Sequence, residues 1–97
     1  MFVLVTYDVS VLTREGRSRL RRIAKTCLDF GVRVQNSVFE CDIEPDKWVR
    51  LKHDLLAIME PNEDSLRFYF LGSRGWEKIE HVGAKMVANP LRDPLIL

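Results

Sequence analysis

Several features that define common classes of protein are missing from this sequence. Its two cysteines, Cys27 and Cys41, form no CxxC pair and have no histidine cluster nearby, which argues against a zinc site or a disulfide framework. We expect both thiols to be buried, since free cysteine behaves as a small apolar residue. No apolar run approaches the roughly 18 residues of a membrane helix, and the N-terminus lacks the basic region and cleavage site of a signal peptide. A cytoplasmic protein without membrane contact is expected.

Motifs for nucleotide and acyl chemistry are also missing. There is no Walker sequence and no GxGxxG, and no serine has the context of a nucleophile elbow. His53 and His81 have no catalytic partner at a characteristic spacing. Serine, cysteine or nucleoside-triphosphate chemistry is therefore not predicted.

The first third of the chain predicts a strand followed by a helix. Residues 2–7 are β-branched and aromatic with too little alternation for a half-exposed strand, so we expect a central strand buried on both faces. Thr13 can cap the following helix, and Gly31 suits its C-terminal end. The apolar positions of this helix recur at spacings of three and four: Leu20, Ile23, Ala24, Cys27 and Leu28.

The rest of the chain continues the alternation of strands and helices. Residues 32–43 predict strand again, with a bend, bulge or tight turn at Gln35, Asn36 and Ser37. Pro45 marks the first turn of a second helix. The apolar face of that helix consists of Trp48, Leu51, Leu55, Ile58 and Met59. A strand is predicted at 66–71, and one more at 78–83.

This order of elements predicts an α+β fold of ferredoxin-like type. The βαββαβ sandwich has an antiparallel sheet with two helices on one face, and here an extra C-terminal strand is added. The uncovered face would then expose apolar strand residues, including some of Val3, Val5, Val38, Phe39, Phe68 and Phe70. We therefore expect a single domain, residues 1–97, that forms a two-fold homodimer through its sheets, with residues 76–97 packing across the dimer. The alternative is that the tail folds back over its own sheet.

Positive charge is concentrated in the first half of a chain of 97 residues with net charge +1. Residues 1–37 carry seven Lys/Arg against three Asp/Glu, and the remainder carries eight against eleven. One stripe of the first helix consists of Arg14, Arg17, Arg21 and Lys25, with Arg22 beside it. Arginine suits bidentate phosphate contact, so this stripe predicts binding to a nucleic-acid backbone. Four such contacts would give a log affinity against log salt slope of about −3.6. The alternative is a solvated helix face.

Asp8 closes the first predicted strand. A carboxylate at the end of a strand is commonly a turn residue or a helix cap. A magnesium site built on it alone would be weak, because Mg²⁺ takes several oxygen ligands and keeps several waters. A two-fold axis near this strand end would bring a second Asp8 to the same place, and substrate phosphates could complete the site.

Several segments together resemble the Cas2 family of CRISPR-associated proteins. They are MFVLVTYDVS at the start, the basic helix ending in Gly31, RVQNSVFEC at 33–41, SLRFYFLG at 65–72 and a tail ending DPLIL. The spacing of YDV and RVQNSVFE carries most of the resemblance, which covers essentially the whole chain. The tail resembles that of members from subtype I-C systems.

The resemblance implies a fold, an assembly and an activity. The family has the ferredoxin-like fold and forms homodimers in which two strand-end aspartates face each other, and it includes Mg²⁺-dependent nucleases acting on single-stranded RNA or duplex DNA. Asp8 occupies the family's metal-binding position, and Arg33 and Phe39 match residues tied to activity. The family's helix arginines correspond to candidates among Arg19, Arg21 and Arg22. In spacer acquisition, the family's dimer bridges two dimers of the CRISPR integrase and holds the incoming DNA.

Two functional hypotheses follow, with a third as a check. In the first, paired Asp8 residues hold Mg²⁺ for phosphodiester cleavage while arginines position the strand. In the second, the same dimer is a DNA-binding scaffold for the integrase and has no nuclease activity. The third is a small-molecule regulatory domain, which many ferredoxin-like folds are, and the arginine-rich helix argues against it.

Overall fold

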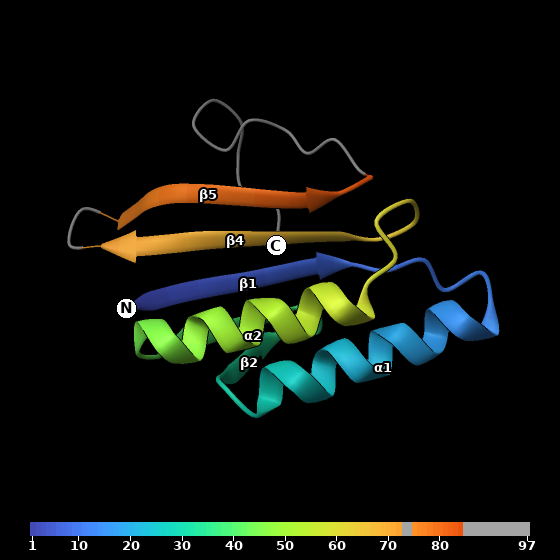
Figure 1. The fold of residues 1–97 in the computed structure, drawn as a ribbon, viewed down its shortest axis with the longest axis horizontal. Coiled ribbons are helices and arrows are strands. Elements are labelled where there is room, and N and C mark those ends of the chain that lie inside the picture. Colours follow the sequence, from blue (N-terminus) through green and yellow to red (C-terminus); the bar gives the residue numbers. More distant parts are fainter. Residues whose placement is uncertain (73–74, 85–97) are drawn as a thin grey trace.

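Five strands and two helices make up the protein in the computed structural model, which describes residues 1–72 and 75–84 (Figure 1). In chain order they are β1 (Phe2–Asp8), α1 (Arg14–Leu28), β2 (Val32–Gln35), β3 (Val38–Asp42), α2 (Pro45–Ile58), β4 (Ser65–Gly72) and β5 (Gly75–Gly83). Neither helix of this described part is long and apolar enough to cross a membrane. The predicted alternation of strands and helices is confirmed.

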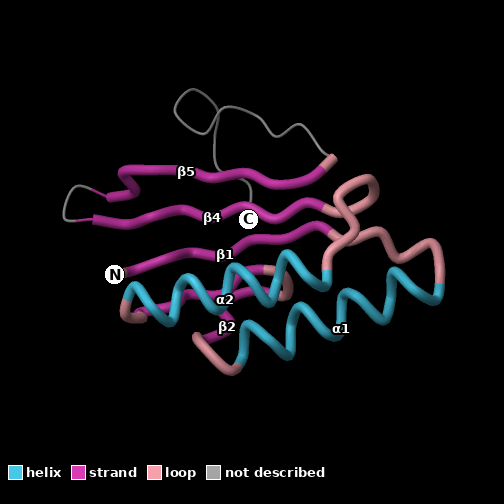
Figure 2. Tube along the Cα trace, viewed as in Figure 1, coloured by secondary structure: helices cyan, strands magenta, loops and turns pink. Residues whose placement is uncertain are grey.

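The strands form one antiparallel sheet in the order β2-β3-β1-β4-β5. The two helices run side by side and make the second layer, as Figure 2 shows. The predicted ferredoxin-like fold is therefore confirmed, and β5 is the extra strand, added at the β4 edge. β5 pairs with β4 of its own chain from Ser65↔Gly83 to Gly72↔Gly75. Residues 85–97 of the predicted cross-dimer tail lie outside the described residues, so packing of 76–97 across a dimer stays a prediction.

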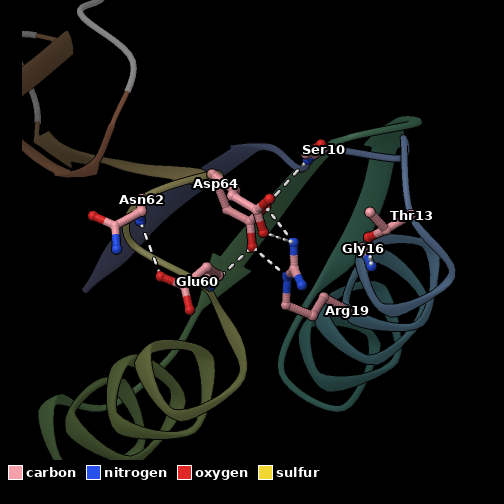
Figure 3. Close-up of polar contacts among 8 residues, drawn as sticks. Ser10, Thr13, Gly16, Arg19, Glu60, Asn62 and Asp64 are labelled. Carbon is pink, nitrogen blue, oxygen red and sulfur yellow. Dashed lines mark hydrogen bonds and ion pairs between the residues drawn. The ribbon is translucent and has the colours of Figure 1, made fainter.

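The start of α1 follows from two local features of its sequence. The Thr13 side chain accepts a hydrogen bond from the Gly16 backbone N–H at 3.0 Å, as its predicted capping role requires. Gly16 is buried, and a Cβ there would lie 1.9 Å from the Ser10 carbonyl oxygen. Only glycine lets the loop after Asp8 pack this closely on the first turn of α1 (Figure 3).

Gly31 lies in the turn that ends α1, where its N–H donates to the Cys27 carbonyl at 2.9 Å, and it also has a second role. The helix ends at Leu28, and Asp29 at its C-cap keeps helical backbone angles. A Cβ on Gly31 would lie 2.4 Å from the Glu40 carbonyl oxygen and 2.5 Å from Cys41 Sγ. Gly31 therefore allows the chain leaving α1 to pass directly against β3.

The polar residues in the middle of segment 32–43 form the predicted turn. β2 and β3 pair as a hairpin around Asn36 and Ser37, with a register shift between Arg33 and Gln35. All four residues of β2 are exposed, because β2 is the edge strand next to β3. This hairpin brings Ser37 to the end of β1, where its carbonyl accepts from the Tyr7 N–H at 3.2 Å.

The core lies between the helices and one face of the sheet. Its strand residues are Val3, Val5, Tyr7, Phe39, Cys41, Leu66 and Phe68, and they pack with Ile23, Cys27, Trp48, Leu51 and Leu55 from the helices. Trp48 contacts the rings of Phe68 and Phe70 edge-on, at 4.8 and 5.1 Å between centroids. Burial of this set is the main source of stability in the fold.

One expectation about the sheet faces was wrong, and another holds only for Val38. β1 alternates along its length, with one face buried and the other half-buried or exposed, so it is not equally buried on both faces. Of the six apolar residues expected among those facing away from the helices, Val38 alone does so. The other five belong to the helix side: Val3, Val5, Phe39, Phe68 and Phe70. The helix-free face mixes polar and apolar residues. It carries Thr6, Asp8, Arg67 and His81, and also Phe2, Leu4, Tyr69, Leu71 and Ile79.

Candidate functional site

The structure places Asp8 in a pocket at the C-terminal end of β1. The Asp8 side chain is exposed on the helix-free face, and Ser65 is its partner across the β1–β4 pair. A pocket of about 450 Å³ lies here and is lined in part by Asp8, Ser37, Ser65, Arg67 and His81. The predicted position of Asp8, at a strand end and open to solvent, is confirmed.

Neighbouring elements hold this end of β1 in place. The Tyr7 hydroxyl donates to the Asn36 carbonyl at 3.1 Å, so the residue before Asp8 is attached to the β2–β3 turn. Burial raises the pKa of the Tyr7 phenol, and the Arg33 guanidinium partly opposes that shift. Tyr7 is therefore a neutral anchor at neutral pH, and Asp8 projects from a strand end fixed on both sides.

A buried ion pair on the other side of the same loop was not predicted. Asp64, at 0% exposure, accepts hydrogen bonds from Arg19 Nε at 2.7 Å, from the Glu60 N–H at 2.9 Å and from the Ser10 N–H at 3.1 Å (Figure 3). Burial alone would raise the pKa of Asp64, but the Arg19 guanidinium and the two backbone donors lower it below its usual value. This pair joins α1, the loop after Asp8 and the loop before β4. A turn-rich PNEDS segment was its only signal in the sequence.

The basic residues of α1 divide into two groups. Arg19 donates to Asp64 and also, through Nη2, to Glu63 at 3.1 Å, and these contacts raise its pKa. Its guanidinium holds the fold together, a role different from the predicted phosphate contact. The other predicted phosphate-binding residues are exposed: Arg14, Arg17, Arg21, Arg22 and Lys25. They form the exposed basic face of α1, and Arg14 and Arg22 also line a groove of about 390 Å³ that includes Ile58 of α2.

Arg33 and Phe39 lie on the helix-covered side of the sheet, away from Asp8. Phe39 is fully buried in the core, and the Arg33 guanidinium lies 5.1 Å from its ring centroid. These residues are partners across the β2–β3 pair. Within one chain, the structure does not bring them together with Asp8.

The remaining side chains of reactive types are the two cysteines and the two histidines. Burial raises the pKa of the Cys27 thiol to about 12 and that of Cys41 to about 11, as expected of core thiols that are not nucleophiles. His53 is exposed and lies 3.5 Å from Asp54. His81 lines the Asp8 pocket opposite Arg67.

Comparison with known proteins adds to this geometry. The family model described as "CRISPR associated protein Cas2" matches residues 1–79. The chain belongs to the Cas2 family. A CRISPR-associated endoribonuclease Cas2 of Chlorobaculum tepidum is 61% identical over 85 residues, 88% of each chain. One of Nitratidesulfovibrio vulgaris is 55% identical over all of this chain and 94% of its own length.

A solved structure supports the same assignment. The crystal structure of Streptococcus pyogenes Cas2 at pH 6.5 has a TM-score of 0.70 and 57% sequence identity, and the match covers 74% of this chain and 87% of that one. Membership of the Cas2 family and its ferredoxin-like fold are therefore confirmed. Assignment to subtype I-C stays a prediction.

One chain alone offers a sparse site for the metal that the Cas2 resemblance implies. In the ranges 1–72 and 75–84, no three His, Cys, Asp or Glu side chains lie close enough together to hold a metal ion. The pocket lining includes one carboxylate, Asp8, with the hydroxyls of Ser37 and Ser65 nearby. Mg²⁺ accepts carboxylate oxygen and keeps several waters, so Asp8 fits as one ligand of an open site and not as a complete cage.

Proposed function

We propose that this Cas2 chain works as a homodimeric nuclease of CRISPR adaptation that cleaves phosphodiester bonds in single-stranded RNA or duplex DNA. The observation that carries the proposal is the placement of Asp8, exposed at a fixed strand end beside a pocket on the helix-free face. The names of the relatives support it, because the proteins of C. tepidum and Halalkalibacterium halodurans are called an endoribonuclease and an endonuclease.

The dimer explains how a single carboxylate per chain can suffice. In the proposed assembly, Asp8 residues of two copies meet at the two-fold axis and hold Mg²⁺ between them, with substrate phosphates completing the ligands. The bound ion would activate water and neutralise charge that develops on the phosphodiester. Tyr7 and the β2–β3 turn keep each Asp8 in position, so the pair is preorganised before substrate arrives.

The exposed basic face of α1 supplies the binding energy for the nucleic acid. In the described part of the chain, none of its five cations forms an ion pair with a carboxylate, which distinguishes them from Arg19. Such contacts go to the phosphate backbone, so they would hold duplex or single strand without selecting a sequence. In the proposed adaptation complex, the dimer bridges two CRISPR integrase dimers and presents this face to DNA.

A DNA-binding scaffold without nuclease activity is the second candidate. The observation that favours it is the sparse lining of the pocket, in which Asp8 is the one carboxylate among the described residues. In this hypothesis the dimer and the basic face of α1 have the same roles, and Asp8 only ends the strand.

Cleavage by purified protein distinguishes the two candidates. Wild type, Asp8→Ala and Asp42→Ala are incubated with linear duplex DNA and with single-stranded RNA, in Mg²⁺ and in chelator. Asp42 is the matched control, because it is an exposed aspartate on the same face at the opposite end of the sheet. Metal-ion catalysis is worth several kcal/mol, so Asp8→Ala should lose roughly 100-fold or more in rate while Asp42→Ala cleaves as wild type does. Equal cleavage by wild type and Asp8→Ala would reject the metal role, and no cleavage by wild type that still binds DNA would favour the scaffold.

A further inference from the structure

Arg67 is a buried cation on the same face as Asp8. It lies in the middle of β4 and is 8% exposed, although arginine is rarely buried without a partner. Its neighbours in the sheet are Thr6 on β1 and His81 on β5, and Asp8 lies one diagonal step away, since Asp8 pairs with Ser65. A diagonal step corresponds to about 7–8 Å between Cα atoms.

One N–H donor of the Arg67 guanidinium has no acceptor in the described part of the chain. This donor is Nε, which is buried. Burying a cationic donor without an acceptor is unfavourable, and most buried polar atoms in folded proteins are paired. Arg67 Nε therefore needs an acceptor that the neighbouring described residues do not supply.

Two contacts hold Arg67 and its strand beside the Asp8 pocket. The guanidinium carbon lies 5.4 Å from the Tyr69 ring centroid, which keeps the planar group against the sheet. The Thr6 hydroxyl donates to the Arg67 carbonyl at 3.4 Å, which connects the backbone of β4 to β1 at this point. Arg67, Ser65 and Asp8 all line the same pocket. Among the described residues, its lining thus combines Arg67 with one carboxylate, one histidine and several hydroxyls.

We propose that Arg67 binds a phosphate oxygen of a nucleic-acid backbone that enters the Asp8 pocket. A guanidinium offers Nε and Nη donors in one plane, which matches two oxygens of a phosphodiester. Asp8 repels such an anion unless a cation lies between them, whereas Arg67 attracts it, so the two residues contact different parts of the bound group. The inference rests on the proposed function in placing the reacting strand at Asp8, and it adds the residue that orients the phosphodiester there.

The direct test uses the side-chain N–H of Arg67 itself. In protein labelled with ¹⁵N-arginine, the Nε–Hε resonance of Arg67 is assigned by its disappearance in Arg67→Lys. A short oligodeoxythymidine is then titrated in chelator, alongside the same sequence with neutral methylphosphonate linkages. The anionic oligonucleotide should shift the Arg67 resonance saturably, and the neutral one should not. An Arg67 resonance that is unmoved at saturation, or that responds only to protein dilution, would overturn the proposal and assign Arg67 to the fold or to contact between copies.

Binding by variants gives a second readout. Arg67→Lys keeps the charge and loses the planar fork, so its dissociation constant for the oligonucleotide should rise about tenfold. Arg50→Lys, an exposed arginine of α2, is the matched control and should bind as wild type does. Equal affinity of wild type and Arg67→Lys would contradict the proposal. If wild type does not cleave but its Arg67 resonance shifts, the nuclease hypothesis fails and the binding role stands; cleavage with an unmoved resonance gives the opposite result.

Discussion

Buried charged residues on the two sides of the sheet differ in whether their hydrogen bonds are formed. On the helix side, the buried carboxylate of Asp64 has Arg19 and two backbone donors as partners, and every feature of the pair serves the fold. On the helix-free side, Asp8 is exposed, and buried Arg67 keeps a donor without a partner in the described residues. A buried group with all its hydrogen bonds formed stabilises the fold, whereas a buried donor without a partner requires an acceptor from a ligand, a water or a second copy.

The same contrast separates the residues that the Cas2 resemblance connects with activity. Asp8 lies where a substrate can reach it, while Phe39 is fully buried in the core and Arg33 lies against its ring. We therefore expect Phe39 to act on activity through the stability of the hairpin and not through contact with substrate. Four predictions test this division.

The largest effect is expected from truncating Phe39. Phe39→Ala should lower the free energy of unfolding by about 4 kcal/mol, because a buried aromatic is replaced by a cavity. Urea unfolding at a fixed protein concentration measures it. The milder Phe39→Leu keeps most of the volume and, once folded, should cleave within about threefold of wild type, since volume-conserving swaps are tolerated best. Loss of cleavage in Phe39→Leu with unchanged stability would place Phe39 in the reaction instead.

Breaking the Arg19–Asp64 pair should have the next largest effect. Asp64→Ala leaves two backbone donors and Arg19 without their acceptor, and should cost about 3 kcal/mol of stability. Glu63→Ala is the matched control, because Glu63 contacts the same arginine but its side chain is 47% exposed. That variant should change stability by less than about 0.5 kcal/mol. Similar losses in the two variants would show that Asp64 is no more important than a surface partner.

Acid should remove the extra free energy of unfolding that Asp64 gives the wild type. The folded-state pKa of Asp64 is lowered from its ordinary value of 3.8, so its stabilising contribution is fully present above that value and is lost as pH falls through the lower folded pKa. The difference in unfolding free energy between wild type and Asp64→Ala should therefore stay constant from neutral pH to about pH 5 and shrink below about pH 4. A difference that is constant throughout this range would mean that the Asp64 charge contributes nothing.

The smallest effect concerns the exposed basic face of α1. Replacing Arg17 and Arg21 together with Ala should reduce the slope of log affinity for duplex DNA against log salt by about 1.8, since each phosphate contact contributes about 0.9. Replacing Lys47 and Arg50 on α2 with Ala makes the same charge change at exposed positions and should leave most of the slope unchanged. An unchanged slope in the α1 variant would identify its basic face as merely solvated.

Local patterns predicted the fold well, and long-range pairings escaped prediction. The capping role of Thr13, Pro45 in the first turn of α2 and the turn at Asn36 depend on neighbouring residues, so the sequence alone sufficed for them. The pairing of Arg19 with Asp64 joins residues 45 apart, and no local pattern connects them. The sheet faces were misassigned because apolar residues occupy both parities, as Val38 and Phe39 do on one strand.

The candidate site was predicted only in part, because some of its residues follow from local patterns and others from long-range pairing. Asp8 follows directly from its place at the end of an apolar strand, and the basic stripe from helical spacing. Arg67 could not be found, because an arginine among the aromatic residues of β4 does not reveal whether it is buried or what it contacts. Its importance depends on the pairing of β4 with β1, which places it beside Asp8.

The central claim is that the metal-dependent chemistry belongs to the Asp8 end of the helix-free face. Paramagnetic broadening by Mn²⁺ in amide NMR spectra of the ¹⁵N-labelled protein tests it most directly, because it locates a bound divalent ion without requiring turnover. Broadening should centre on Asp8 and extend to Ser65, and it should vanish in Asp8→Ala. Broadening that persists in Asp8→Ala, or that centres on Glu40 and Asp42 at the far end of the sheet, would contradict the account.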